Sequence, residues 1–481
     1  MERKNAWKDY SDKEISALNK LSEGYIDFIS ECKTERLCAK QAIKLAEKAG
    51  YVSLESARKK GAKLKAGDKI WADIYGKSIM LVQLGKKPLS EGFNILGAHI
   101  DSPRLDLKQN PLYETNDFVL LDTHYYGGIK NYQWVTLPLA LYGVIAKKDG
   151  SLVEVSIGDK ADDPVFCVTD LLPHLGDEQM KKTGNLVVEG ENLDILVGSQ
   201  PSSFTEEQAN VAGEKKKKTY EDELKILSQK EPVKAQILSL LFDEYGIEEE
   251  DFLSAELEVV PAGRARECGF DRSLILGYGQ DDRVCAYTSL VAQLEVNNPK
   301  TTSVCILADK EEIGSVGATG MTSMFFENTI AEIMELAGEG GILPLRRALS
   351  HSNMLSSDVS AAFDPAYASV FEAKNSAYCG KGLVFNKYTG ARGKSGSNDA
   401  NAEYIAFLRK IMDEAEVHFQ TAELGRVNAG GGGTIAYILA QYGMNVIDCG
   451  VPVLSMHAPW EVTSKADVYE AYRGYVAFLN A

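Results

Sequence analysis

The sequence has too little positive charge for a nucleic-acid or membrane partner. Its 481 residues include 69 acidic side chains against 52 lysines and arginines, which gives a formal net charge of −17. Polyanions bind basic surfaces because binding releases counterions, so we expect neither nucleic acid nor an anionic membrane as a partner. The basic run at residues 215–218 has acidic neighbours and is interpreted as a solvated loop or helix start.

Long hydrophobic runs are also missing. The opening residues MERKNAWKDY contain no apolar core of signal-peptide length, and no later segment approaches the roughly 18 uninterrupted apolar residues of a membrane span. We therefore expect a cytoplasmic protein. The eight cysteines form no C-x-x-C pair, and Cys285, Cys305 and Cys449 lie in apolar runs. This pattern indicates buried thiols in a reducing compartment, not a disulfide framework or a cysteine zinc site.

Several familiar catalytic motifs do not occur. The chain has no G-x-S-x-G elbow and no H-E-x-x-H helix, which argues against a serine hydrolase and against a single-zinc peptidase. The glycine run at residues 430–433 has no Lys-Ser or Lys-Thr after it. Gly393-Lys394-Ser395 also fails the phosphate-loop pattern, because Tyr388 stands where that pattern needs a glycine.

The remaining sequence predicts an α/β protein with an inserted domain. With 44% hydrophobic residues the chain is long enough for two or three domains. Residues 102–254 are typical of strands and turns, include a polar stretch at 198–218 and contain no metal-ligand pairs, whereas the flanking segments alternate helices and strands. We therefore predict one catalytic domain from residues 1–101 and 255–481, interrupted by an inserted β-rich domain at 102–254.

The local patterns predict individual elements by spacing. Two helices are expected between Ser11 and Gly50, and a last helix is expected after Ser464, which can cap it. The other predicted helices are 284–295, 324–337 and 399–415, and the predicted strands are 69–72, 78–84, 93–100, 118–123, 135–145, 152–157, 303–308, 366–372 and 451–454.

Acidic and histidine side chains gather at five predicted strand ends or turns. These are G-A-H-I-D around His99, G-Q-D-D-R around Asp281, D-K-E-E-I-G around Glu311 and Glu312, S-S-D-V-S around Asp358, and S-M-H-A-P around His457. Carboxylates drawn into one cleft repel each other, and each buried ion costs several kcal/mol, so the cluster needs cations among its members. The sequence therefore predicts a dinuclear metal site.

His99 and Asp101 are two residues apart on a strand and point to the same side. This arrangement is typical of a metal-binding histidine with a supporting carboxylate, although a lone strand histidine is also common in a protein core. His457 closes a second apolar strand and allows the same two readings.

Two acidic pairs suggest separate roles. Glu311 and Glu312 reach one site only where the strand breaks, at Ile313-Gly314, and then divide into a ligand and a general base. Asp281 or Asp282 can bridge two metal ions, which lie roughly 3.5–4 Å apart in two-metal hydrolases. Each pair also has an alternative without a metal: Glu311 and Glu312 could be solvated loop residues, and Asp281 and Asp282 could favour a helix N-terminus. Asp358 could likewise cap a turn.

The ordered motifs resemble one family, the aspartyl aminopeptidases, which are dinuclear zinc exopeptidases of the co-catalytic aminopeptidase clan. The matching strings are G-A-H-I-D-S-P-R-L-D, Q-D-D-R, D-K-E-E-I-G-S, S-S-D-V-S-A-A-F-D-P and S-M-H-A-P, in family order across nearly the whole chain.

The resemblance implies a role for each position. His99 and Asp358 would hold one metal, Glu312 and His457 the other, Asp281 would bridge them, Glu311 would be the general base, and Asp101 would support His99. It also implies a three-layer α/β/α catalytic domain with a central mixed sheet, and an inserted domain that dimerises. The implied assembly is a closed homo-oligomeric shell built from dimers, such as a dodecamer.

Two further residues are carried over as candidates for substrate binding. His174, in L-L-P-H-L, resembles an inserted-domain histidine that reaches a neighbouring active site. Lys387 lies one step from Asn386, where the family often has lysine, and Ala361 stands where acid-preferring members have histidine. The preference for an acidic residue at P1, the position before the cleaved bond, is therefore left open.

The predicted function is a metalloaminopeptidase that removes N-terminal residues from peptides. Water bound between two zinc ions has its pKa lowered from 15.7 towards about 7, and Glu311 would take its proton and pass one to the leaving amine. Manganese or cobalt would also suit a carboxylate-rich set. The alternatives are another dinuclear amide hydrolase, such as an acyl-amino-acid deacylase, and a non-catalytic shell or cargo protein on the same fold.

Overall fold

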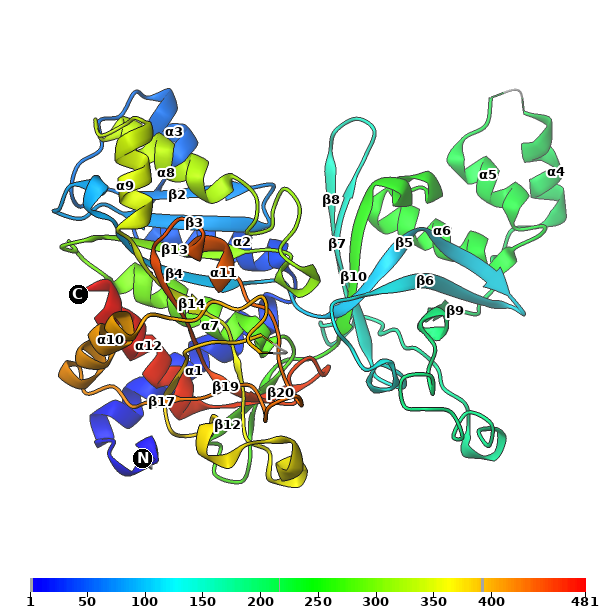
Figure 1. The fold of residues 1–481 in the computed structure, drawn as a ribbon. Helices are drawn as coiled ribbons and strands as arrows, with labels where there is room; N and C mark the ends of the chain where they lie inside the picture. The colour runs from blue at the N-terminus through cyan, green and yellow to red at the C-terminus, as the bar shows by residue number, and fades with distance from the viewer. Residues whose placement is uncertain (1–2, 216, 391–392) are drawn as a thin grey trace. The chain divides into compact units, whose positions relative to one another are not determined.

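The chain folds into two compact units. The computed structural model describes residues 3–215, 217–390 and 393–481 (Figure 1). The first unit contains residues 1–102 and 264–481, and the second contains residues 103–263. The six candidate metal ligands and bases between His99 and His457 all fall in the first unit.

A nine-stranded mixed sheet forms the centre of the first unit. Its order is β1 (Val52–Ser53), β2 (Lys69–Ile74), β3 (Ser78–Gln83), β13 (Thr302–Ala308), β4 (Phe93–His99), β14 (Asn353–Ser357), β18 (Asn445–Gly450), β16 (Leu383–Asn386) and β17 (Phe419–Thr421). Strands β13, β4, β14 and β18 run parallel. Their carboxyl ends therefore meet at one edge, where Ala308 pairs with His99.

Helices cover both faces of this sheet (Figure 1). One apolar core is shared with α1 (Asp12–Glu31), α2 (Glu35–Lys48), α7 (Gln280–Glu295), α10 (Ala402–Glu414) and α12 (Lys465–Leu479). The other is shared with α3 (Leu54–Lys59), α8 (Phe325–Leu336), α9 (Ile342–Ser350) and α11 (Ala436–Ala440). Along β4, Leu96 and Ala98 enter the first core while Phe93 and Ile95 enter the second, as the alternation of a strand requires. The expected three-layer α/β architecture is confirmed.

A small five-stranded sheet lies in the same unit. Its order is β11 (Arg266–Cys268), β12 (Leu274–Gly277), β20 (Glu461–Ser464), β19 (Pro452–Leu454) and β15 (Ser360–Ala361). His457 lies in the turn between β19 and β20. Short 3-10 helices complete the unit: η1 (Ala6–Lys8), η2 (Leu89–Glu91), η7 (Glu311–Ile313), η8 (Pro365–Val370) and η9 (Ala373–Asn375).

The second unit contains a six-stranded antiparallel sheet. Its order is β8 (Leu152–Ile157), β7 (Leu139–Ala146), β10 (Ala255–Pro261), β5 (Arg104–Thr115), β6 (Phe118–Tyr126) and β9 (Ile195–Gly198). The unit also contains α4 (Glu206–Glu214), α5 (Tyr220–Leu227), α6 (Pro232–Tyr245), η3 (Asn131–Gln133), η4 (Pro173–Leu175), η5 (Gly190–Asn192) and η6 (Glu249–Ser254). It runs through Gly263, nine residues beyond the expected boundary at 254, because β10 pairs with both β7 and β5.

Most predicted elements of the first unit are confirmed. Ser11 caps α1 by accepting the N–H of Glu14, and Ser464 caps α12 by accepting the N–H of Ala466. The strand predicted at 366–372 is wrong: η8 occupies this segment, and the Asp364 side chain caps its first turn. Helices α4, α5 and α6 were not predicted. In the lysine run, Lys215 bonds Asp222, whereas residue 216 lies outside the described residues.

No helix in the described part of the chain is both long enough and apolar enough to span a bilayer. All eight cysteines lie in the described part of the chain and are free thiols.

Candidate metal centre

His99 ends β4 at the carboxyl edge of the parallel strands. Its side chain is buried, and its Nδ1 atom lies 3.0 Å from the backbone oxygen of Asp101 and 3.3 Å from Asp101 Oδ1. This leaves Nε2 facing Asp281 Oδ1 at 3.2 Å. Burial lowers the pKa of His99, but the Asp101 and Asp281 carboxylates outweigh it and hold the pKa well above its usual value. Nε2 is therefore the nitrogen that faces the other candidate ligands.

Asp281 lies between the two histidines. Gly279 precedes α7 with φ of 70°, and Asp281 and Asp282 depart from helical geometry in its first turn. Asp281 Oδ2 lies 3.2 Å from His457 Nε2, on the opposite side from the His99 contact. Asp282 instead accepts the backbone N–H of His99 at 3.3 Å. This geometry favours Asp281 over Asp282 as the bridging residue.

Glu311 and Glu312 share one turn directly after β13. Lys310 (φ 68°) and Gly314 (φ 94°) both adopt left-handed backbone conformations and enclose η7. The turn brings both side chains to the same site: Glu311 Oε2 lies 3.9 Å from His99 Nε2, and Glu312 Oε2 lies 3.6 Å from His457 Nε2. Burial is the main cause that raises the pKa of Glu311 to about 7 and that of Glu312 well above its usual value.

Asp358 directly follows β14 and completes the cluster. Ser356 pairs with Gly97, so the parallel register places Asp358 level with His99. Asp358 Oδ1 lies 4.0 Å from His99 Nε2. Burial, followed by the charge of Asp281, raises the pKa of the Asp358 carboxyl well above its usual value.

The donor set fits divalent metal ions. Three groups have ligand atoms within 4.8 Å of one another: His99, Glu311 and Asp358; His99, Asp281 and Glu312; and Asp281, Asp282 and Asp358. Glu312 Oε1 is buried and accepts no hydrogen bond from the described residues. Asp281 Oδ1 also lacks a hydrogen bond of good geometry despite its contact with His99. Buried carboxylates are strongly destabilising without a compensating cation, which a metal ion supplies.

Glu461 is a site residue that the sequence did not reveal. It begins β20, is buried, and accepts the backbone N–H of Asp281 at 3.1 Å and that of His457 at 2.8 Å. Burial and the charge of Asp281 raise the pKa of Glu461 to about 8. A single glutamate four residues after a histidine matches no recognised sequence motif. Its role can therefore be seen only in the folded structure.

The candidate substrate residues lie in different units. His174 belongs to η4 of the second unit and has an exposed side chain. Lys387 follows β16, is exposed, and forms an ion pair with Asp399. Asn386 is buried, accepts a hydrogen bond from Ser360 Oγ, and donates to the backbone oxygen of Ala422.

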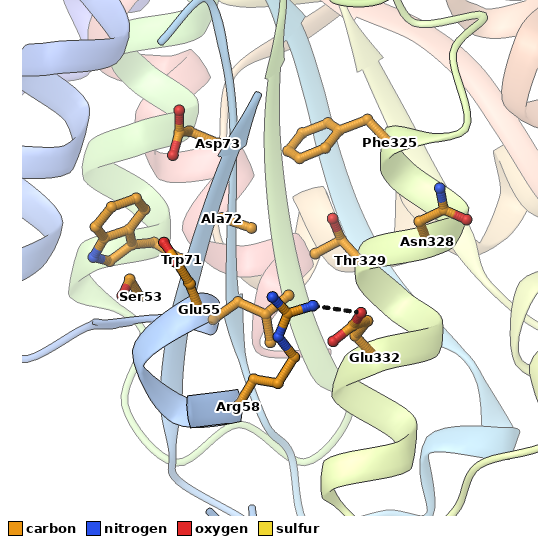
Figure 2. A pocket seen from close by; sticks show the side chains of 11 residues that line it. Ser53, Glu55, Arg58, Trp71, Ala72, Asp73, Phe325, Asn328, Thr329 and Glu332 are labelled. Carbon is orange, nitrogen blue, oxygen red and sulfur yellow. Dashed lines mark hydrogen bonds and ion pairs between the residues drawn. The ribbon is translucent and has the colours of Figure 1, made fainter. Parts of the chain in front are cut away.

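Figure 2 shows a separate pocket in the first unit, of about 310 Å³. Trp71 and Asp73 of β2 line it together with Glu332 of α8, and an ion pair of 3.4 Å joins Arg58 to Glu332. None of the candidate metal ligands lines this pocket, so it is not part of the cluster around His99 and His457.

Comparison with known proteins identifies the family of the chain. The family described as "Aminopeptidase I zinc metalloprotease (M18)" matches residues 28–479. The probable M18 family aminopeptidase 1 of Clostridium acetobutylicum is 59% identical over 479 residues, which cover 100% of this chain and 98% of the relative. The corresponding protein of Thermotoga maritima is 44% identical and covers 100% and 99% of the two chains.

Solved structures give the same answer. The crystal structure of aminopeptidase I from Clostridium acetobutylicum is 57% identical, with a TM-score of 0.89 over 100% of both chains. The M18 aminopeptidase from Thermotoga maritima is 42% identical, with a TM-score of 0.91 over 100% of this chain and 99% of that one. The mApe1 dodecamer of S. cerevisiae shares the fold, with a TM-score of 0.74 at 19% identity over 96% and 97%. The chain belongs to the M18 family of zinc aminopeptidases and is a metalloaminopeptidase.

Proposed function

We propose that this aminopeptidase removes N-terminal residues from peptides with two zinc ions bound in the cluster. The observation that carries the proposal is the Asp281 carboxylate, whose two oxygens each lie 3.2 Å from a different histidine. His99 and Asp358 would hold one ion, at what we call the His99 position. His457 and Glu312 would hold the other, at the His457 position, and Asp281 would contact both. Bound zinc ions would acidify water and polarise the scissile carbonyl.

Glu311 is the proposed general base. Its carboxylate faces the same cluster as the ligands, and its backbone N–H is fixed by a hydrogen bond of 3.1 Å to Asp101 Oδ1. Glu311 would take a proton from the attacking water and return one to the leaving amine. Asp101 would orient His99 through the contacts at Nδ1, which keep Nε2 towards the metal.

The substrate preference is proposed from fewer contacts. An acidic P1 side chain needs a cationic partner, and the Asn386 amide is occupied by Ser360 and Ala422. We therefore assign any acidic preference to Lys387, which would exchange Asp399 for the substrate carboxylate. His174 would reach a neighbouring active site, as the family resemblance implies.

The proposed assembly is a homo-oligomeric shell of dimers that form through the second unit. The dodecamer of the yeast relative supports a closed shell by analogy of fold. The free cysteines support a reducing compartment, and we propose that the enzyme works in the cytoplasm.

Metal analysis together with an aminoacyl-anilide panel, with and without chelator, tests the proposal. We expect two zinc ions per chain, activity that chelation abolishes and zinc restores, and no cleavage of substrates with blocked N-termini. Manganese or cobalt in the purified protein would revise the metal. Hydrolysis of N-acylated substrates would instead indicate a deacylase, and one ion per chain would contradict the dinuclear site.

A further inference from the structure

The carboxylate of Glu461 joins two segments of the metal centre. Its Oε2 atom accepts the backbone N–H of Asp281 at 3.1 Å, and its Oε1 atom accepts that of His457 at 2.8 Å. Asp281 is 180 residues away in the chain, at the start of α7, whereas His457 lies in the turn that leads into β20. Only 1% of the Glu461 surface is exposed, so both oxygens face these amides instead of solvent.

Both amides belong to backbone that ordinary secondary structure does not satisfy. Asp281 has φ of −80° and ψ of 106° within the first turn of α7, where N–H groups have no partner in the helix. His457 has φ of 65°, a left-handed conformation that residues with a side chain seldom adopt. Glu461 supplies the acceptor for each of these two amides. The direction of each side chain therefore depends on the same carboxylate.

We propose that Glu461 is a positioning residue that sets the separation of Asp281 and His457, and thereby the metal affinity of the His457 position. This inference rests on the proposed dinuclear site. Glu461 acts through the two backbone amides and is not itself a proposed ligand or base.

The His99 position has its own support. His99 Nδ1 contacts Asp101, and Asp101 also accepts the backbone N–H groups of Glu311 and Glu312, each at 3.1 Å. None of these contacts involves Glu461. Loss of Glu461 should therefore weaken one metal position much more than the other, a result that a general loss of stability would not produce.

The test is stepwise titration of the metal-free full-length protein with zinc, by calorimetry and by competition with a chromogenic chelator. Glu461→Gln keeps the shape of the side chain but offers one acceptor oxygen, and its amide group faces the second N–H. Loss of a supporting contact weakens metal binding by about 10- to 100-fold. We expect that loss for one of the two ions and a much smaller change for the other. Glu461→Asp, which retracts the carboxylate by one methylene, should weaken the binding of the same ion.

Asp467→Asn is the matched control. Asp467 of α12 is buried and accepts the backbone N–H groups of Gly380 and Gly382, each at 2.7 Å. None of these three residues is a proposed ligand. This variant undergoes the same change from carboxylate to amide, so its thermal midpoint should fall. Both zinc affinities should stay at the wild-type value.

Three results would overturn the inference. The first is wild-type affinity for both ions in Glu461→Gln, or in Glu461→Asp if the glutamine variant does not fold. The second is an equal loss in Asp467→Asn, which would assign the effect to stability. The first two leave the dinuclear site intact. Binding of a single ion by the wild-type protein, the third result, would remove the dinuclear site as well.

Discussion

Asp101 accepts the backbone N–H of Glu311 at 3.1 Å through Oδ1. Its second oxygen, Oδ2, accepts the N–H of Glu312 at the same distance. Because the same carboxylate also contacts His99 Nδ1, it fixes a histidine and the turn that carries both glutamates. Asp101 therefore orders more of the site than the support of one imidazole would require.

Asp101→Asn should lower metal affinity and turnover together. The amide can accept only one of the two N–H groups, so the turn at Glu311 loosens while His99 loses its charged partner. Loss of such a contact costs about 10- to 100-fold in metal affinity or activity. Zinc titration and kcat/KM for an aminoacyl anilide measure the effect, with Asp467→Asn as the control for stability. Unchanged zinc affinity would contradict this role.

Glu311→Gln should retain its metals and lose turnover. Glutamine preserves the shape and the backbone bond to Asp101 but cannot accept a proton. General acid–base catalysis contributes about 10²- to 10⁴-fold, so kcat should fall by that factor. Zinc content by mass spectrometry and single-turnover kinetics check the two halves of the prediction. Near wild-type kcat would exclude Glu311 as the base.

Local patterns in the sequence were enough to predict the strand ends that carry the site. His99 closes β4 and the two glutamates follow β13, because buried strands have continuous apolar sequence that stops where the site begins. Ser11 and Ser464 likewise cap α1 and α12 through bonds within three residues. These features depend only on residues that are close in the chain, so they can be predicted from a single sequence.

Features that depend on distant partners could not be predicted in this way. Glu461 gains its role only when β20 meets the start of α7. The choice of Asp281 over Asp282 depends on backbone angles in the first turn of α7 that no local pattern specifies. The segment 366–372 has strand-like composition, yet Asp364 and Pro365 start a 3-10 helix there.

Zinc binding should release protons at pH 7. In the metal-free protein the Asp101 and Asp281 carboxylates outweigh burial and raise the pKa of His99, whereas burial raises those of Glu312 and Asp358. These groups therefore bind protons more tightly than free side chains do, and zinc affinity should rise with pH by about tenfold per unit for each proton that the metal ion displaces. Calorimetry in buffers of different ionisation enthalpy counts the protons. A binding constant independent of pH between 6 and 8 would contradict the shifts.

Gly450→Ala should disturb the His99 position through the backbone of Asp358. A methyl group at Gly450 of β18 would lie 1.9 Å from the backbone oxygen of Asp358 and 3.1 Å from Cys285 Sγ. Overpacking of this kind typically costs about 1–3 kcal/mol, and here relief requires Asp358 itself to move. We expect a lower free energy of unfolding and weaker binding of one zinc ion, measured by denaturant titration and calorimetry.

Gly433→Ala is the control for that substitution. Among the described residues, apart from the two chain neighbours of Gly433, no heavy atom lies within 4 Å of a methyl group at this position. The residue does not have a left-handed φ, so stability and zinc binding should stay at the wild-type values. If Gly450→Ala lowered the free energy of unfolding but left both zinc affinities unchanged, β18 would not position Asp358. If Gly433→Ala also weakened zinc binding, the glycine run would belong to the metal centre, and the ligand assignment would have to include its backbone.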